Sequence, residues 1–541
     1  MITKLLGIQS KTIGAAALLL AGSTLASRIL GLLRDRLLAS NFGAGEELDI
    51  YFAAFRIPDF IFGILIMGGF TAVFLPIFSE YFEKSKDEAF DMVSNLLNVL
   101  LVLLAGFAFV LFLFMPFFVQ FVTPGFSGEM REAVIPLARL MLLSPILLGI
   151  SAVFSGMLQY FGKFFVYSLA PVLYNLGIII GIIFLVPTLG LIGLAWGVVL
   201  GAVLHVLIQL YPVFVSGFSF KRMFSFSHPS LLRMARLTAP RMVGAAAFHI
   251  NLVVITALAS TLAVGSIAVL SFANNLYFLP IGVIGISLAT AAFPLLSRAA
   301  SRKDDGEFKE SLLRTVRTIF FFIIPISGFM FLLREHIIRL VLGGGEFGWQ
   351  DTRLTAAVFG AFALGVFYQA LVPLFARAFY ALKDTKTPTL IGIGAVISNV
   401  IIALVLLWVF SFPNFIGTWI ISFFGIADIK DIRVLALPLA ISVSVTIQGF
   451  LLALFLKRKI GLNIRKISGP LNRIGISGLL MGGASFLALK GVFLFLPLDT
   501  FLNVLLQVIF VVVVGIATYL LAAKIFKVEE LYLLPFFKKK K

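Results

Sequence analysis

The sequence predicts an all-α polytopic membrane protein, and three observations lead to that fold class. Of 541 residues, 60% are hydrophobic and 13% are charged, and the mean hydropathy of +1.09 is too high for a soluble globular domain. Apolar stretches of about 20 residues recur along the chain, each long enough to cross a hydrocarbon core of about 30 Å as a helix. The alternating pattern of an outer-membrane β-barrel is missing. We therefore expect a bundle of membrane-spanning helices.

The apolar stretches divide into about fourteen predicted spans. The first is longer than the hydrophobic part of a signal peptide and no A-x-A cleavage site follows it, so we interpret it as a retained span. An even number of spans places both termini on one side of the membrane. The spans lie at about 13–34, 56–80, 92–120, 133–159, 166–187, 190–214, 240–264, 269–297, 314–341, 354–381, 388–411, 433–456, 470–496 and 502–525.

The distribution of Lys and Arg predicts which side the termini occupy. Three loops on the terminal side, at 221–236, 297–317 and 457–466, are basic, as is the KKKK at the C-terminus, whereas the opposite loops near 188 and 264 carry no Lys or Arg. Positive residues favour the cytoplasmic side, so both termini are predicted to be cytoplasmic. This distribution also explains the net charge of +18 without nucleic acid as a partner.

Two stretches indicate an internal repeat. Residues 52–79 contain FAAFRIPDF and GGFTAVFLPIFS, and residues 272–297 contain FANNLYFLP and SLATAAFPLLS. Because an even number of spans separates them, the two halves share one orientation, which predicts a parallel pseudo-repeat. We therefore expect two six-helix lobes followed by two further helices and a basic cytoplasmic tail. The predicted divisions are 1–220, 221–460 and 461–541.

Charged residues at the end of the first span are the candidates for a binding site. Arg28 follows about thirteen apolar or small residues and lies deep in the span, and Arg34 and Asp35 come one to two turns later. A charge inside a span costs a few kcal/mol and usually faces protein or water. An alternative for Arg34, Asp35 and Arg36 is that they reach the membrane interface and pair locally.

More charges stand at the start of the second span. Asp49, Arg56 and Asp59 flank Pro58, where a break in the helix frees backbone groups. A cavity rich in Arg and poor in acids suits an anion, and the guanidinium group binds phosphate through two parallel hydrogen bonds. The predicted ligand is therefore anionic.

Enzyme chemistry finds little support in the sequence, and no metal or other cofactor is predicted. The chain has no Cys, and its four His show no metal-binding spacing; His249 is better interpreted as a polar contact between helices. The pair Gly68 and Gly69 is not followed by G-K-[ST], so it favours close helix packing over a phosphate loop. Energy is expected to come from the membrane potential or an ion gradient.

Several strings together resemble the MurJ (MviN) family, the lipid II flippases of bacterial cell-wall synthesis. The N-terminal part contains SRILGLLRD (27–35), FGAGEELDIYFAAFRIPD (42–59) and GGFTAVFLPIFSEYF (68–82). Further strings of this kind are TPGF (123–126), LAPVLYNLGIII (169–180), PRMVGAAAFHINL (240–252) and, most specifically, RAFYALKDTKTP (377–388). The resemblance spans nearly the whole chain.

The resemblance implies a transporter of the multidrug/oligosaccharidyl-lipid/polysaccharide exporter superfamily, whose two lobes rock around a central cavity. The last two helices would form a groove for the polyprenyl tail. The residues implied to bind the diphosphate and its sugar are Arg28, Arg34, Asp35 and Asp49.

The sequence departs from the family at two arginine positions, now Phe62 and Asn275. MGGF (67–70) stands where the family has an E-G-A-F motif, and ANNLYFLP (273–280) replaces a run with Asp, Arg and Glu. Asn275 is retained as a candidate substrate contact. The candidate replacements for the lost cations are Arg56, Arg241 and Arg377, the last two of which also suit simple anchoring at the interface.

The expected function is movement of lipid II from the inner to the outer leaflet by alternating access. The lost arginines keep two alternatives open, export of another lipid-linked oligosaccharide and a transport-deficient scaffold in a cell-wall complex. The expected partners are a lipid-linked diphosphate sugar, membrane lipids and cell-wall synthesis proteins.

Overall fold

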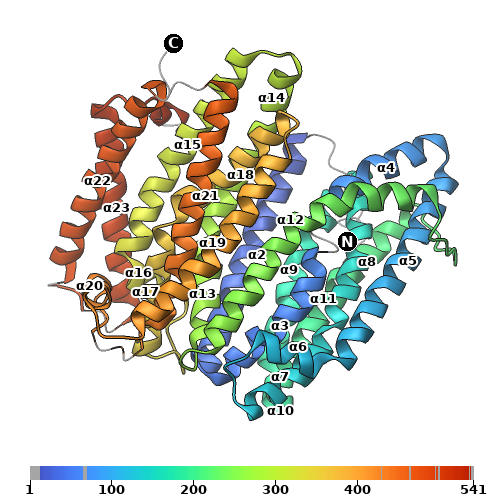
Figure 1. Cartoon of the computed structure of the whole chain (residues 1–541), viewed down its shortest axis with the longest axis horizontal. Helices are drawn as coiled ribbons and strands as arrows, with labels where there is room; N and C mark the ends of the chain where they lie inside the picture. Colours follow the sequence, from blue (N-terminus) through green and yellow to red (C-terminus); the bar gives the residue numbers. More distant parts are fainter. Residues whose placement is uncertain are drawn as a thin grey trace. The chain divides into compact units, whose positions relative to one another are not determined.

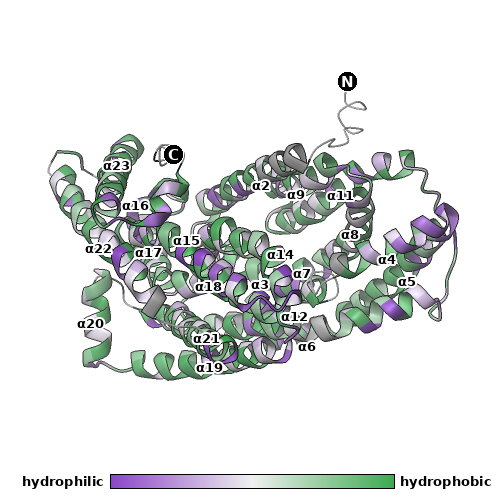
Figure 2. Cartoon of the chain, turned by 90° about the horizontal axis from the view of Figure 1, so that it is seen from above, coloured by the Kyte–Doolittle hydropathy of each residue, from purple (hydrophilic) through white to green (hydrophobic). Residues whose placement is uncertain are grey.

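The computed structural model is built of helices, and its described part contains no β-strand. The chain divides into two compact units, residues 1–268 and 269–541. Figure 2 shows hydrophobic residues along the helices of both units. The residues described are 13–64, 70–427, 429, 431–461, 465–493, 495–497, 500–534 and 537.

The first unit holds the helices that carry the predicted arginines. They are α2 (Ile13–Phe42), α3 (Glu46–Phe62), α4 (Phe70–Lys84), α5 (Lys86–Leu113), α6 (Met115–Val122), α7 (Gly128–Met141), α8 (Leu143–Tyr160), α9 (Phe164–Ile180), η2 (Gly181–Leu185), α10 (Val186–Leu189), α11 (Ile192–Val215) and α12 (Pro229–Ser260).

The second unit begins within the first turn of α13. Its elements are α13 (Ser266–Pro280), η3 (Ile281–Ile286), α14 (Ser287–Ser301), α15 (Asp305–Leu332), α16 (Arg334–Val341), α17 (Trp349–Ala363), α18 (Val366–Ala381), α19 (Lys386–Phe410), α20 (Phe415–Phe424), η4 (Arg433–Leu435), α21 (Ala436–Ile460), α22 (Arg465–Phe493), α23 (Phe501–Ile525) and η5 (Glu529–Leu533).

The predicted spans all fall on helices of the structure. Ten described helices are long and apolar enough to cross a membrane, and a pair bent by 44°, α17 with α18, gives an eleventh. The remaining predicted spans coincide with α2, with α3 and α4, and with α12. The all-helical membrane fold is therefore confirmed, and the count of fourteen is consistent with it.

The two stretches of the predicted repeat share a local feature. A π-helical turn begins at 63–64 after α3, and the π-helix η3 separates α13 from α14 about 220 residues later. Compactness divides the chain near residue 268, which places α12 with the first unit. Compactness does not test how the halves arose, so the predicted divisions at 220 and 460 stay predictions.

The MGGF string (67–70) lies largely outside the described residues, as do Gly68, Gly69 and the KKKK tail.

Polar side chains at the helix starts explain several boundaries. The Ser85 hydroxyl accepts a hydrogen bond from the Glu88 N–H at the start of α5, and Ser127 caps α7 in the same way through Met130. Such caps satisfy N–H groups that have no partner within the helix. They therefore fix where α5 and α7 begin.

Helix α9 packs against both α2 and α11 in the first unit. Figure 1 shows α9 and α11 side by side. Glycines at intervals of four residues line α11 on one side and α9 with the following η2 on the other. A Cβ atom added to Gly177 would lie 2.3 Å from Gly201 Cα, and one added to Gly181 would lie 2.5 Å from Gly197 Cα. Small residues let helix backbones approach closely in a membrane, which accounts for this pairing.

The last two long helices, α22 and α23, pack against α15 and α16 in the second unit. Buried polar contacts join them. The Tyr519 hydroxyl donates to the Phe321 carbonyl at 2.8 Å, and His336 Nε2 lies 2.8 Å from Gln507 Oε1. The two helices are thus attached to the second unit through specific hydrogen bonds as well as apolar packing.

Candidate functional site

Arg34 on α2 is held by two neighbours in the first unit. Its Nη2 and Nε atoms donate to Asp35 Oδ1 at 2.7 and 3.0 Å, and Nη1 donates to Asn175 Oδ1 on α9 at 3.1 Å. The Asp35 side chain is 3% exposed, while that of Arg34 is 22% exposed. The local pairing predicted for Arg34 and Asp35 is therefore present, and the Arg34 side chain remains partly exposed.

Arg28 lies on the same helix and is half-buried. Its guanidinium group makes no hydrogen bond or ion pair with any residue that the structure describes. A cation within an apolar helix is costly unless protein, water or a ligand compensates it. Arg28 is thus available to an anionic ligand.

Arg56 projects from α3 toward α12. Its Nε donates to Thr256 Oγ1 at 2.8 Å, and the Thr256 hydroxyl donates in turn to the Leu252 carbonyl at 2.9 Å. This bond uses one of the five N–H donors of the guanidinium group. The other donors have no partner in the described part of the chain.

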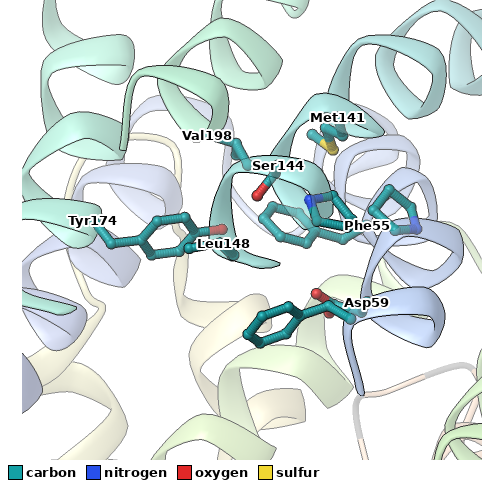
Figure 3. Close-up of a pocket in the computed structure, with 10 residues that line it drawn as sticks. Phe55, Asp59, Met141, Ser144, Leu148, Tyr174 and Val198 are labelled. Atoms are coloured by element: carbon teal, nitrogen blue, oxygen red, sulfur yellow. The ribbon is translucent and has the colours of Figure 1, made fainter. Parts of the chain in front are cut away.

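Asp59 follows Arg56 by almost one helical turn and borders a small cavity in the first unit. The space open to the centre of a water molecule is about 20 Å³, enough for about one water. In Figure 3 the hydroxyl groups of Tyr174 and Ser144 point toward each other, and the carboxyl group of Asp59 lies across from them. Both Arg34 and Arg56 lie within electrostatic range of this carboxyl group. Asp59 therefore joins the surroundings of the two arginines.

Asp49 occupies a different position, near the start of α3. Its carboxyl group is 2% exposed and accepts hydrogen bonds from the Gly265 N–H at 2.7 Å and the Ala268 N–H at 2.8 Å. Gly265 has φ +90°, and a Cβ atom there would lie 2.0 Å from the Ala44 carbonyl oxygen. Both Asp49 oxygens are thus used to fix the segment after α12, and a role in substrate binding stays a prediction.

The other predicted positions are distributed over both units. Phe62, where the family has an arginine, lines the cavity beside Asp59. Asn275 lies on α13 and Arg377 on α18, and both are half-buried in the second unit. The side chain of Arg241 lies outside the described residues.

Two of the family-like strings have structural roles. In TPGF, the Gly125 N–H donates to Ser260 Oγ of α12 at 3.1 Å, and the Thr123 carbonyl accepts from Arg131 Nε of α7 at 3.1 Å. These bonds fasten the segment after α6 to α12 and to α7. In RAFYALKDTKTP, the Asp384 carboxyl group accepts a hydrogen bond from the Thr387 N–H in the first turn of α19 at 3.0 Å.

Asp384 also forms an ion pair with Lys459 at the end of α21. Burial alone would raise the pKa of the Asp384 carboxyl group, but the hydrogen bonds from Lys459 and Thr387 lower it to about 2. The string therefore ties the turn between α18 and α19 to α21.

Sequence reasoning missed Asn175 and Thr256 as partners of the arginines. Each is a polar residue surrounded by apolar residues in a predicted span, and this feature of the sequence could have indicated a polar contact with another helix. The imidazole of His249 lies against Gly63, directly after α3, and makes no hydrogen bond there, so the polar helix contact expected for His249 stays a prediction.

Comparison with known proteins agrees with this fold. The family model described as "Lipid II flippase MurJ" matches residues 38–506, a range that includes Asp49 and Arg56 and begins after Arg34. A "Probable lipid II flippase MurJ" of Haemophilus influenzae is 31% identical over 397 residues, covering 70% of this chain and 77% of that protein. The "Lipid II flippase MurJ" of Burkholderia cenocepacia is 28% identical over 399 residues, covering 71% and 76%.

Solved structures share the architecture. One titled "Lipid II flippase MurJ, inward closed conformation" has a TM-score of 0.75 and 26% identity, and covers 95% of this chain and 99% of that one. An inward-facing multidrug resistance MATE transporter of the MOP superfamily has a TM-score of 0.66 at 16% identity, covering 82% and 96%, which shows a common fold. The family match extends over most of the chain. This chain therefore belongs to the MurJ family of lipid II flippases.

Proposed function

We propose that this chain moves lipid II, the undecaprenyl-diphosphate-linked precursor of peptidoglycan, from the inner to the outer leaflet of the cytoplasmic membrane. The observation that carries the proposal is the presence of cations with unused donors inside the first unit. Arg28 has no partner among the described residues, and Arg56 uses one donor. Together with Arg34 they offer charge and hydrogen bonds to a diphosphate.

The proposed chemistry is binding and release without a covalent step. A diphosphate head group would replace water around the guanidinium groups and offset the cost of keeping them in the membrane. The lobes would then expose the site to either side in turn, while the polyprenyl tail stays in lipid beside α22 and α23. Membrane lipids and cell-wall synthesis proteins are the proposed partners, and no catalytic activity is proposed.

The proposed orientation places both termini and the 297–317 loop in the cytoplasm, because the Lys and Arg residues gather there. The absence of Cys makes this simple to test. A single Cys introduced at Ser301 is expected to resist an impermeant thiol reagent added to intact cells and to react after permeabilisation. Labelling in intact cells would contradict the orientation.

Depletion rescue tests the transport function. The chain is expected to support growth of a strain depleted of its own lipid II flippase, and Arg28→Ala and Arg34→Ala are expected to abolish rescue at normal membrane yield. The matched control is Arg236→Ala, because Arg236 is exposed on α12. Failure of the wild type to rescue, despite insertion, would contradict the proposal and favour another lipid-linked glycan. Full rescue by either variant would exclude that arginine as a diphosphate ligand.

A further inference from the structure

Helix α3, with the helical residue Gly63 directly after it, meets α12 at two positions seven residues apart. Arg56 contacts Thr256, and Gly63 contacts His249, so the two helices run antiparallel. Seven residues are nearly two turns, which puts both contacts on one face of α3 about 10 Å apart. Asp59 lies between them along α3.

The contact at Gly63 is specific to glycine. A Cβ atom built on Gly63 would lie 1.8 Å from His249 Nε2 and 2.0 Å from Cε1, so no other side chain fits while the imidazole keeps this position. The imidazole is half-buried and makes no hydrogen bond or ion pair with the residues that the structure describes. His205, in contrast, is paired, with Nδ1 lying 2.6 Å from Ser151 Oγ.

Charges around this face are few. Arg56 lies within electrostatic range of both Asp59 and His249, and Arg34 acts on Asp59 from α2. Tyr51 of α3 and Tyr174 of α9 are the other titratable groups that interact with Asp59. In the described part, the remaining helices packed on α3 and α12 contribute no charged group that acts on either residue.

Resting on the lipid II function proposed above, we propose that Asp59 and His249 belong to the head-group site and that binding of the diphosphate takes up a proton there. The unpaired imidazole would serve as a cation beside Arg56. A diphosphate next to Arg56 attracts a protonated imidazole and repels the Asp59 carboxylate, so the bound anion favours a proton on either group. The proton comes from solvent and sits on an imidazole nitrogen or a carboxyl oxygen.

Linkage gives the size of the effect. If one proton is taken up per bound head group, affinity rises as pH falls, by at most about tenfold per pH unit. The affinity stops rising at a pH so low that the group is already protonated in the free protein. A head-group site made only of arginines would show no such dependence between pH 6 and pH 8, apart from the titration of the ligand itself.

Calorimetry of the purified full chain with a short-chain lipid II analogue tests the inference. Titrations at one pH in two buffers of different ionisation enthalpy count the protons bound. We expect net uptake for the wild type, reduced uptake for Asp59→Asn and for His249→Gln, and wild-type uptake for His205→Gln as the matched control. The number of protons taken up by the wild type is measured without any variant, so a variant that fails to fold does not prevent the test of the inference.

The outcomes separate this inference from the proposed function. Binding of the analogue with no proton uptake, and equal affinity at pH 6 and pH 8, overturns the role of Asp59 and His249 while leaving the transport function intact. Absence of binding by a well-folded wild type overturns both. Uptake that persists unchanged in the Asp59→Asn, His249→Gln double variant places the proton elsewhere and also refutes the inference.

Discussion

Replacement of Asp49 by Ala tests whether this carboxyl group supports the fold or binds substrate. Asp49 accepts two backbone N–H groups, from Gly265 and Ala268, at 2.7 and 2.8 Å. A hydrogen bond to a charged group contributes about 1.5 to 3 kcal/mol, so two give an upper limit of about 3 to 6 kcal/mol. The variant avoids the cost of burying a charge, which lowers the net loss to about 2 to 4 kcal/mol.

The measurement is thermal unfolding of purified protein in one detergent, alongside depletion rescue. Asp49→Ala is expected to unfold at a clearly lower temperature, and Asp49→Asn to fall between it and the wild type because the amide keeps one acceptor oxygen. Asp87→Ala is the control, since Asp87 is exposed in the first turn of α5 and contributes about 0.3 to 1 kcal/mol there. Wild-type unfolding of Asp49→Ala together with lost rescue would refute the structural role and support substrate binding.

Three further changes test other contacts. Gly197→Leu should force α11 away from α9 and η2, because Gly181 Cα of η2 would lie 2.9 Å from an added Cβ, and should sharply reduce the yield of folded protein on size-exclusion chromatography. Tyr519→Phe should lower the free energy of unfolding by about 1 kcal/mol by removing a hydrogen bond to α15, measured by denaturant titration; no change would show that the bond is dispensable. Because its pKa is lowered to about 2, Asp384 should keep its link to Lys459 above pH 4 and lose it only as pH falls through about 2, so the melting temperature of Asp384→Asn should differ from wild type equally at pH 5 and pH 8.

The helices were predictable because the membrane imposes a simple rule on sequence. A spanning segment must be long, apolar and helical, so hydropathy alone located the ten long apolar helices of the described residues and the bent pair α17 and α18. The bend itself was not predicted. At this bend Gly365 approaches Ser442 so closely that an added Cβ would lie 2.8 Å from Ser442 Cα, and only the packed structure shows that contact.

The composition of the site was partly predictable, and its contacts were not. Arg28, Arg34 and Arg56 were recognisable because charge is rare in spans. Their partners depend on which faces of α2, α3, α9 and α12 meet, and a shift of one residue along a helix rotates a side chain by about 100°. Hydropathy does not determine that rotation.

A charged residue in a membrane span signals function only when its charge is not already used by the protein. The structure divides the predicted charges on this basis. Asp49 is fully engaged by two backbone amides, and Asp35 is buried against Arg34. Arg28 has no partner in the described part of the chain, and Arg56 has one. Unused hydrogen-bonding capacity inside an apolar environment has to be offset by water or by ligand, so these two arginines, and not the two acids, are where a transported anion gains most by binding.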